Sequence, residues 1–234
     1  MRYCAILLIV FGGFGSRAQE SSAETLFREL QLEIWQIEEH LTDELADRSF
    51  NYSYLIIKED DTTKYEANFD PRRPSEERWQ LTAYNDSTPS KHHKKEFREF
   101  RTAPVERPHA LIDTTRIAIL ENSETKLAIE FYYNKEELPE HLEYLKKCKG
   151  VAWFSKTSKH LERTEISNTA PLEFRLLPVH SFHRSVFFEP AGRDKTLLIK
   201  EEQTEIMADV FGRTTRVKEI KSYSNYEIIS EGHK

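Results

Sequence analysis

Histidines and one cysteine are the side chains of this sequence whose types could do chemistry. His180 and His183 lie three residues apart in a predicted strand, where they point to opposite faces and cannot easily bind one metal ion. Cys148 follows His141 by seven residues. On a helix that spacing is about 10 Å along the axis, beyond hydrogen-bond reach. We therefore predict a buried structural thiol at Cys148, no catalytic residues, no metal site and no cofactor.

Other charged groups and motifs give no stronger signal. His92-His93 lies among Lys91, Lys94 and Lys95. The prediction is that these residues form the solvent-exposed start of a helix, and the alternative is that they form a basic patch for anionic lipid headgroups. Glu59-Asp60-Asp61 lacks the alternating carboxylates and the glycine of a calcium loop. The chain has only seven glycines and no phosphate loop, nucleophile elbow or His-Glu-x-x-His motif. The prediction is that the protein is not an enzyme. His180 or His183 beside a carboxylate in a cleft would favour the alternative of an unrecognised hydrolase.

The first nineteen residues are typical of a secretory signal peptide. Arg2 precedes an apolar core of roughly ten residues, and Ser16-Arg17-Ala18 fits a small-x-small cleavage site. That core is too short to span a bilayer. We therefore divide the chain into a signal peptide (1–19) and a single domain (20–234) with no transmembrane segment in the mature chain.

Cysteine content and charge restrict the location and the partners. Cys148 is the one cysteine left after cleavage, whereas small secreted eukaryotic domains usually carry several. This favours the periplasm of a Gram-negative bacterium. A net charge of -6 argues against nonspecific binding of nucleic acid. The chain has 14 Phe, 10 Tyr and 3 Trp, which is enough bulk for a folded core.

One long N-terminal helix is predicted by the apolar pattern. Ser21-Ser22-Ala23-Glu24 has the form of a capping box. Apolar residues then recur every three or four positions, at Leu26, Leu30, Ile34, Ile37, Leu41 and Leu45. This spacing predicts an amphipathic helix of about six turns that covers an apolar surface.

From residue 50 onward, a period of two predicts strands. Hairpins are expected around the turns at 121–124, 157–159 and Gly212. Helical interruptions are expected at 89–101 and 136–147, with a loop at 102–113. The predicted fold class is α+β: a curved antiparallel β-sheet, an incomplete barrel, packed on the long N-terminal helix and on short helices.

Several strands are apolar on both faces, so the sheet needs two covers. The helix can supply one cover, and the other side is either a second layer or an apolar cavity. The aromatic residues that would line such a cavity are Trp35, Tyr54, Trp79, Phe131, Trp153, Phe174, Phe182 and Phe187. The alternative for each of them is a close-packed core.

The chain resembles the periplasmic outer-membrane lipoprotein carrier superfamily, the lipoprotein-sorting chaperones and their uncharacterised proteobacterial relatives, over roughly residues 22–229. The residues that carry the resemblance are Arg78-Trp79-Gln80-Leu81, Thr88-Pro89-Ser90, Gly150-Val151-Ala152-Trp153-Phe154, Arg163-Thr164-Glu165-Ile166-Ser167-Asn168, Val210-Phe211-Gly212 and Ser222-Tyr223-Ser224-Asn225-Tyr226. The resemblance implies an incomplete antiparallel barrel around helices, with an apolar cavity for acyl chains and no catalysis. No single position matches the lid-locking arginine of the family.

The predicted function is noncatalytic binding or carriage of a lipid or lipidated polypeptide, through burial of its acyl chain at roughly 0.8 kcal/mol per CH₂. Release would follow movement of the helices or of the loop at 102–113. The partners expected are a lipid acyl chain or a lipoprotein, no nucleic acid, and a possible envelope protein. The first alternative is a cell-envelope interaction or stress-sensing module without a small-molecule ligand.

Overall fold

The computed structural model describes residues 25–28, 30, 32, 37, 48–101, 112–136, 138–174, 177–191 and 196–229. The strands of this part are β1 (Arg48–Lys58), β2 (Asp61–Phe69), β3 (Trp79–Tyr84), β4 (Ala118–Asn122), β5 (Lys126–Phe131), β6 (Cys148–Ser155), β7 (His160–Asn168), β8 (Leu172–Phe174), β9 (Leu177–Ala191), β10 (Thr196–Val210) and β11 (Arg213–Ile228). The helical elements with printed bounds are η1 (Ser75–Glu77), α3 (Lys91–Arg101) and η2 (Glu140–Lys147). The predicted signal peptide, Trp35 and the loop residues 102–111 lie outside the described residues.

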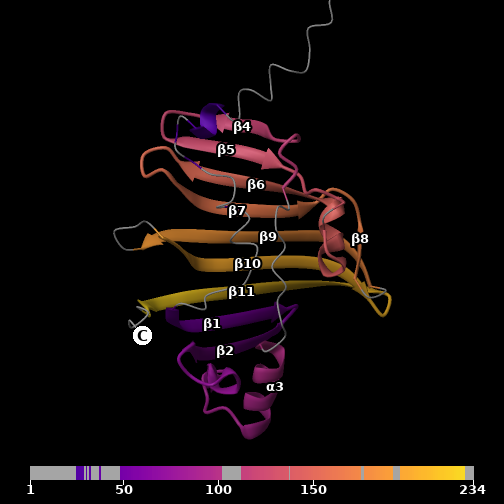
Figure 1. Cartoon of the computed structure of the whole chain (residues 1–234). Helices are drawn as coiled ribbons and strands as arrows, with labels where there is room; N and C mark the ends of the chain where they lie inside the picture. Colours follow the sequence, from indigo (N-terminus) through magenta and orange to yellow (C-terminus); the bar gives the residue numbers. More distant parts are fainter. Residues whose placement is uncertain are drawn as a thin grey trace, which may run out of the picture.

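The eleven strands of the described residues form one open antiparallel sheet (Figure 1). Its order is β3-β2-β1-β11-β10-β9-β7-β6-β5-β4, and β8 pairs with β9 beside this path. β3 and β4 stand at the two ends, so the sheet is not closed. The C-terminal strand β11 lies in the interior of the sheet, between β1 and β10, and joins the first three strands to the rest. The prediction of an antiparallel sheet with few helices is confirmed.

The three predicted hairpins are present. β4 and β5 are joined at residues 123–125, and β6 and β7 at residues 156–159. Between β10 and β11 the turn residues Phe211 and Gly212 both have positive φ, at 51° and 76°. Two such residues fit the turn that matches the right-handed twist of paired strands. Local turn chemistry and alternation were therefore sufficient to predict these pairings.

The single long N-terminal helix is not supported by the residues described in that stretch. Residues 25–28, 30 and 37 are helical, but Leu32 is not, and its N–H donates to the carbonyl O of Phe27 at 2.9 Å. Phe27, Leu32 and Ile37 are all buried. A five-residue step turns an ideal helix by roughly 140° from its starting face, so one continuous helix could not bury all three on one side. The rest of the predicted helix lies outside the described residues.

The two short helical segments differ from each other. α3 ends as predicted at Arg101, but it begins at Lys91, two residues later than expected. Ser90 precedes it, and the Oγ of Ser90 accepts a hydrogen bond from the N–H of His93 at 3.2 Å. The second segment is a 3₁₀ helix, η2, that begins at Glu140 after Pro139. It buries Leu145 and half-buries Leu142. Among the described residues, no helix is long and apolar enough to cross a bilayer.

Strand register defines the two faces of the sheet. One row of paired residues crosses nine strands on a single face: Ile129, Ala152, Thr164, Val186, Glu202, Lys221, Tyr54, Tyr65 and Tyr84. We call this the inner face, because Ile129, Ala152 and Val186 are at most 1% exposed. The neighbouring row, which includes Trp153, Arg163 and Phe187, lies on the opposite, outer face.

Candidate ligand-binding surface of the sheet

The inner face carries a group of aromatic rings on β1, β2, β3 and β11. We call it the aromatic cluster: Phe50, Tyr52, Tyr65, Phe69, Trp79, Tyr223 and Tyr226. The centroid of the Phe50 ring is 5.0 Å from that of Phe69 and 5.6 Å from that of Trp79. The Tyr52 ring lies 5.3 Å from Trp79 and 5.4 Å from Tyr223. Most of these contacts are tilted or edge-on, the arrangements that aromatic rings prefer.

Helix α3 covers this cluster with one stripe of side chains. His93 stacks on Tyr84 at 3.9 Å, and the Phe97 ring lies 6.1 Å from Trp79. The guanidinium of Arg101 lies 4.5 Å from the Trp79 ring centroid. These three residues are four apart, so they share one face of the helix. Residues 91, 92, 94–96, 98 and 99 of α3 are exposed and mostly basic, so the described ring contacts of the helix with the sheet come from the stripe of His93, Phe97 and Arg101.

The eight predicted cavity residues do not all face one space. Tyr54 and Trp79 lie on the inner face at the aromatic cluster, where Tyr54 is 5.9 Å from Tyr65. Phe131 and Phe182 are buried farther along the inner face. The ring of Phe182 contacts Tyr144 of η2 at 5.7 Å.

Trp153 and Phe187 alternate to the outer face, so they cannot line a cavity on the inner one. The guanidinium of Arg163 lies between them, 4.9 Å from the Trp153 ring and 5.9 Å from the Phe187 ring. Phe174 belongs to β8, but its side chain, like all of Trp35, is outside the described part of the structure. An apolar run has two apolar faces, and only the pairing register decides which face is inside.

A buried carboxylate lies in the middle of the inner face. Glu202 is 2% exposed. Its Oε2 accepts from Nη2 of Arg184 at 2.7 Å and lies 3.9 Å from Nζ of Lys221, while Tyr223 OH donates to Oε1 at 2.6 Å. Burial alone would raise the pKa of Glu202, but the attraction of Arg184 and Lys221, with the hydrogen bonds from Tyr223 and Arg184, lowers it to about 2. The carboxylate is therefore ionised at neutral pH.

Sequence reasoning missed this network. Glu202 belongs to the polar run Lys200-Glu201-Glu202-Gln203, which is typical of a solvent-exposed strand. Its partners Arg184, Lys221 and Tyr223 are 18, 19 and 21 residues away on β9 and β11, and only the register of three strands brings them together.

The two histidines on β9 have different partners. His180 Nε2 lies 2.8 Å from Oδ2 of Asp209, and Thr214 donates to Oδ1 of the same carboxylate at 2.8 Å. His183 Nε2 lies 3.1 Å from the hydroxyl of Ser185. The side chains of His180 and Asp209 are 42% and 37% exposed. The described residues place no hydroxyl or thiol against the second ring nitrogen of His180, and they form no group of three metal-ligating side chains.

The thiol of Cys148 is buried, as the sequence predicts. Its Sγ donates to the carbonyl O of Tyr144 at 3.4 Å, and burial raises its pKa to about 11. Because the thiolate is the reactive form, we expect Ellman's reagent at pH 8 to modify Cys148 at least about a hundredfold more slowly in the native protein than in urea. An exposed thiol on the same scaffold, Ser224→Cys with Cys148→Ser, serves as the fast control. Equal native rates for the two thiols would contradict the burial.

Comparison with known proteins gives distant matches. No protein-family model and no curated protein matches the sequence. The chain is similar, at 10% identity, to the crystal structure of an outer membrane lipoprotein-sorting protein domain from Vibrio parahaemolyticus, over 88% of this chain and 94% of that chain with a TM-score of 0.34. It is also similar, at 10% identity, to a DUF1329 family protein from Desulfovibrio piger, over 89% of this chain and 94% of that chain with a TM-score of 0.37. One of these solved structures is thus a lipoprotein-sorting domain, and the sequence of this chain resembles the family of lipoprotein-sorting chaperones.

Proposed function

We propose that this protein is a noncatalytic periplasmic carrier that binds the acyl chain of a lipid or lipidated polypeptide on the inner face of its sheet. The first nineteen residues would be a cleaved signal peptide, and residues 20–234 would act as one binding domain. The observation that carries the proposal is the aromatic cluster beneath α3. It is a wide apolar surface whose described cover is one short, basic helix.

The contacts of α3 support displacement of that helix by a ligand. Phe97 is 3% exposed and is the one aromatic side chain that the structure describes as buried by this helix. Ring and cation–π contacts such as those of His93 and Arg101 contribute about 1 kcal/mol each. An acyl chain gains roughly 0.8 kcal/mol for each buried CH₂. Burial of the Phe97 side chain contributes about 1.5–3 kcal/mol more. A chain of about eight methylenes on the aromatic cluster would therefore offset the contacts that α3 loses.

Quenching of tryptophan fluorescence tests this proposal, because bromine atoms on a stearate chain quench only the indoles they touch. The probe is dibrominated stearate, added to residues 20–234 purified without detergent. We expect saturable quenching that is largely lost in Trp79→Phe, because Trp79 lies in the aromatic cluster. The matched control is Trp153→Phe, which removes an indole on the outer face and should leave the quenching intact.

Native mass spectrometry of the same protein identifies the natural ligand. Extra mass that disappears on solvent extraction and matches a phospholipid or fatty acid supports the carrier. A clean apo mass together with no saturable quenching would refute it. Quenching that depends on Trp153 and not on Trp79 would refute the assigned surface.

A second candidate function is a protein-interaction module of the cell envelope, and the edge strand β4 favours it. Within the part of the chain that the structure describes, β4 pairs with β5 alone, and it exposes 36% of Ile119 and 54% of Leu120. An unpaired apolar edge is a template for strand addition by a partner. Under this alternative, association in solution should be lost in Leu120→Lys while dibrominated stearate has no effect.

A further inference from the structure

A polar pocket lies at one end of four strands, apart from the ring contacts of α3. Its volume is about 660 Å³, within the range of pockets that hold small molecules. It is formed where β1 and β3 begin and where β2 and β11 end. It is lined by Ser49, Asn51, Asn68, Gln80 and Glu227, by three arginines, and by aromatic residues of the cluster.

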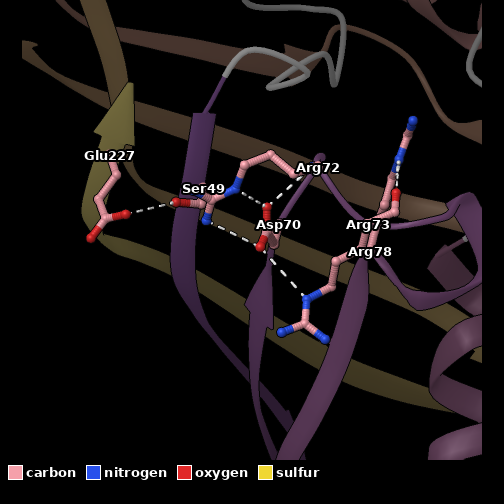
Figure 2. Close-up of polar contacts among 6 residues, drawn as sticks. All are labelled: Ser49, Asp70, Arg72, Arg73, Arg78 and Glu227. Atoms are coloured by element: carbon pink, nitrogen blue, oxygen red, sulfur yellow. Dashed lines mark hydrogen bonds and ion pairs between the residues drawn. The ribbon is translucent and has the colours of Figure 1, made fainter. Parts of the chain in front are cut away.

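Three arginines reach this pocket from the segment that joins β2 to β3, and Asp70 holds that segment in place (Figure 2). The Oδ1 atom of Asp70 accepts from the backbone N–H of Arg72 at 3.1 Å and from its Nε at 2.8 Å. The backbone N–H of Asp70 donates to the carbonyl O of Arg78 at 2.9 Å. The hydrogen bond from Arg72 is the main cause of the lowered pKa of Asp70. The turn is therefore preorganised, with Arg72 and Asp70 as a neutral pair.

The other two guanidinium groups keep most of their donors. Nε of Arg73 lies 3.6 Å from Oδ2 of Asp70, and its Nη atoms point away from that carboxylate in Figure 2. Nε of Arg78 donates to the carbonyl O of Arg73 at 3.4 Å, and within the described residues no carboxylate pairs with Arg78. The pocket also contains Glu227, whose Oε2 accepts from Ser49 at 3.5 Å. Its local charge is thus positive, although the whole chain has a net charge of -6.

Amide side chains form the neutral part of the same pocket. Asn51 pairs with Asn68 across β1 and β2, and Asn68 pairs with Gln80 across β2 and β3. The three amides therefore form a row on the outer face, next to the arginine turn. Each amide both donates and accepts hydrogen bonds, which suits the hydroxyl groups of a sugar or glycerol.

We propose that this pocket binds a phosphate group carried by a hydroxyl-rich moiety, as in a phosphorylated saccharide or a glycerophosphate headgroup. Arg73 binds the phosphate oxygens, because its guanidinium fork matches phosphate geometry. The side chain of Arg78 points to the other side of the turn in Figure 2 and adds positive charge. The amide row binds the neighbouring hydroxyls, and the volume exceeds what a bare phosphate needs. Arg72 and Asp70 position the turn. Phe50, Phe69 and Tyr226 belong to both this pocket and the aromatic cluster, but the proposed phosphate and hydroxyl contacts are made by residues outside the cluster.

Titration with glucose 6-phosphate, followed by the NMR signals of the arginine Nε and asparagine amide groups, tests the site. We expect saturable shifts confined to the pocket, with inorganic phosphate weaker and glucose weaker still. Arg73→Gln should raise the Kd about tenfold, the effect of losing one charge-assisted hydrogen bond, and Arg78→Gln should raise it less. Asn68→Ala should weaken glucose 6-phosphate more than inorganic phosphate, which a purely electrostatic site would not do.

The matched control is Arg213→Gln, which removes an exposed arginine at the opposite end of β11. Equal weakening by Arg213→Gln would overturn the proposal in favour of diffuse attraction. Cosedimentation with phosphatidylcholine vesicles, with and without phosphatidylglycerol, separates the two sources of phosphate. Binding only to phosphatidylglycerol vesicles, lost in Arg73→Gln, assigns a lipid headgroup, whereas pocket shifts with glucose 6-phosphate assign a soluble saccharide. No response to either probe would overturn the site.

Discussion

Glu202→Leu is expected to lower the free energy of unfolding by about 3–5 kcal/mol, because it leaves two cations on the inner face without their shared carboxylate. Arg184 and Lys221 are 22% and 19% exposed, so water replaces the lost partner only in part. Tyr223 also loses its acceptor. In urea unfolding monitored by circular dichroism, the midpoint should fall without a change in slope.

Two further variants separate the charge from the position. Glu201→Leu makes the same change one residue earlier, on the outer face, and should cost about 1 kcal/mol or less. The triple variant with leucine at 184, 202 and 221 should recover most of the stability, because an apolar replacement of a buried ion network is often neutral. A single Glu202→Leu variant as stable as the wild type would show that the network contributes nothing.

The ion network of Glu202 also makes the free energy of unfolding depend on pH in the acid range. The pKa of Glu202 is lower in the folded protein than in the unfolded chain, where a glutamate has a pKa of about 4.3. Its contribution is therefore present above that value and is lost as pH falls towards the folded pKa of about 2. Between these limits, the wild-type protein should lose more stability than Glu202→Gln, which has no carboxyl to protonate.

Gly150→Ala is expected to destabilise the fold by about 3 kcal/mol, the upper range for overpacking a dense core. A Cβ at residue 150 would lie 2.6 Å from Cε1 of Phe131 and closer still to two other atoms of that ring. Phe131 is fully buried, so the ring cannot turn into solvent. The thermal midpoint should fall by roughly 10 °C for a chain of this size.

A second substitution tests the cause of that effect. Phe131→Leu removes the ring that meets the new methyl group, so the double variant should be less destabilised than the two single effects added together. Gly212→Ala provides the contrast. No atom lies within 4 Å of a Cβ there, and its cost would come only from φ at 76°. Additive effects of Gly150→Ala and Phe131→Leu would show that the two residues do not compete for space.

Which aromatic residues belong to the candidate site could be predicted from the sequence only in part. Tyr54 and Trp79 were identified from apolar strand runs, and the structure places both on the inner face with other rings. Trp153 and Phe187 came from equally apolar runs, yet they lie on the outer face beside Arg163. Alternation separates the residues of a strand into two sets, but it does not say which set is buried. The bulges near Trp153 and Glu201 shift that alternation further.

The sequence by itself determined the local elements of this protein: the hairpins β4–β5, β6–β7 and β10–β11, and the helix α3 that follows Ser90. Turn residues, helix caps and apolar alternation depend on residues that are close together in the sequence, so these elements can be predicted from the sequence alone. Only the tertiary structure decided the pairing of β1 with β11, about 170 residues apart. The ion network of Glu202 and the arginine pocket depend on that kind of long-range register, because partners on different strands meet only when the whole sheet has formed.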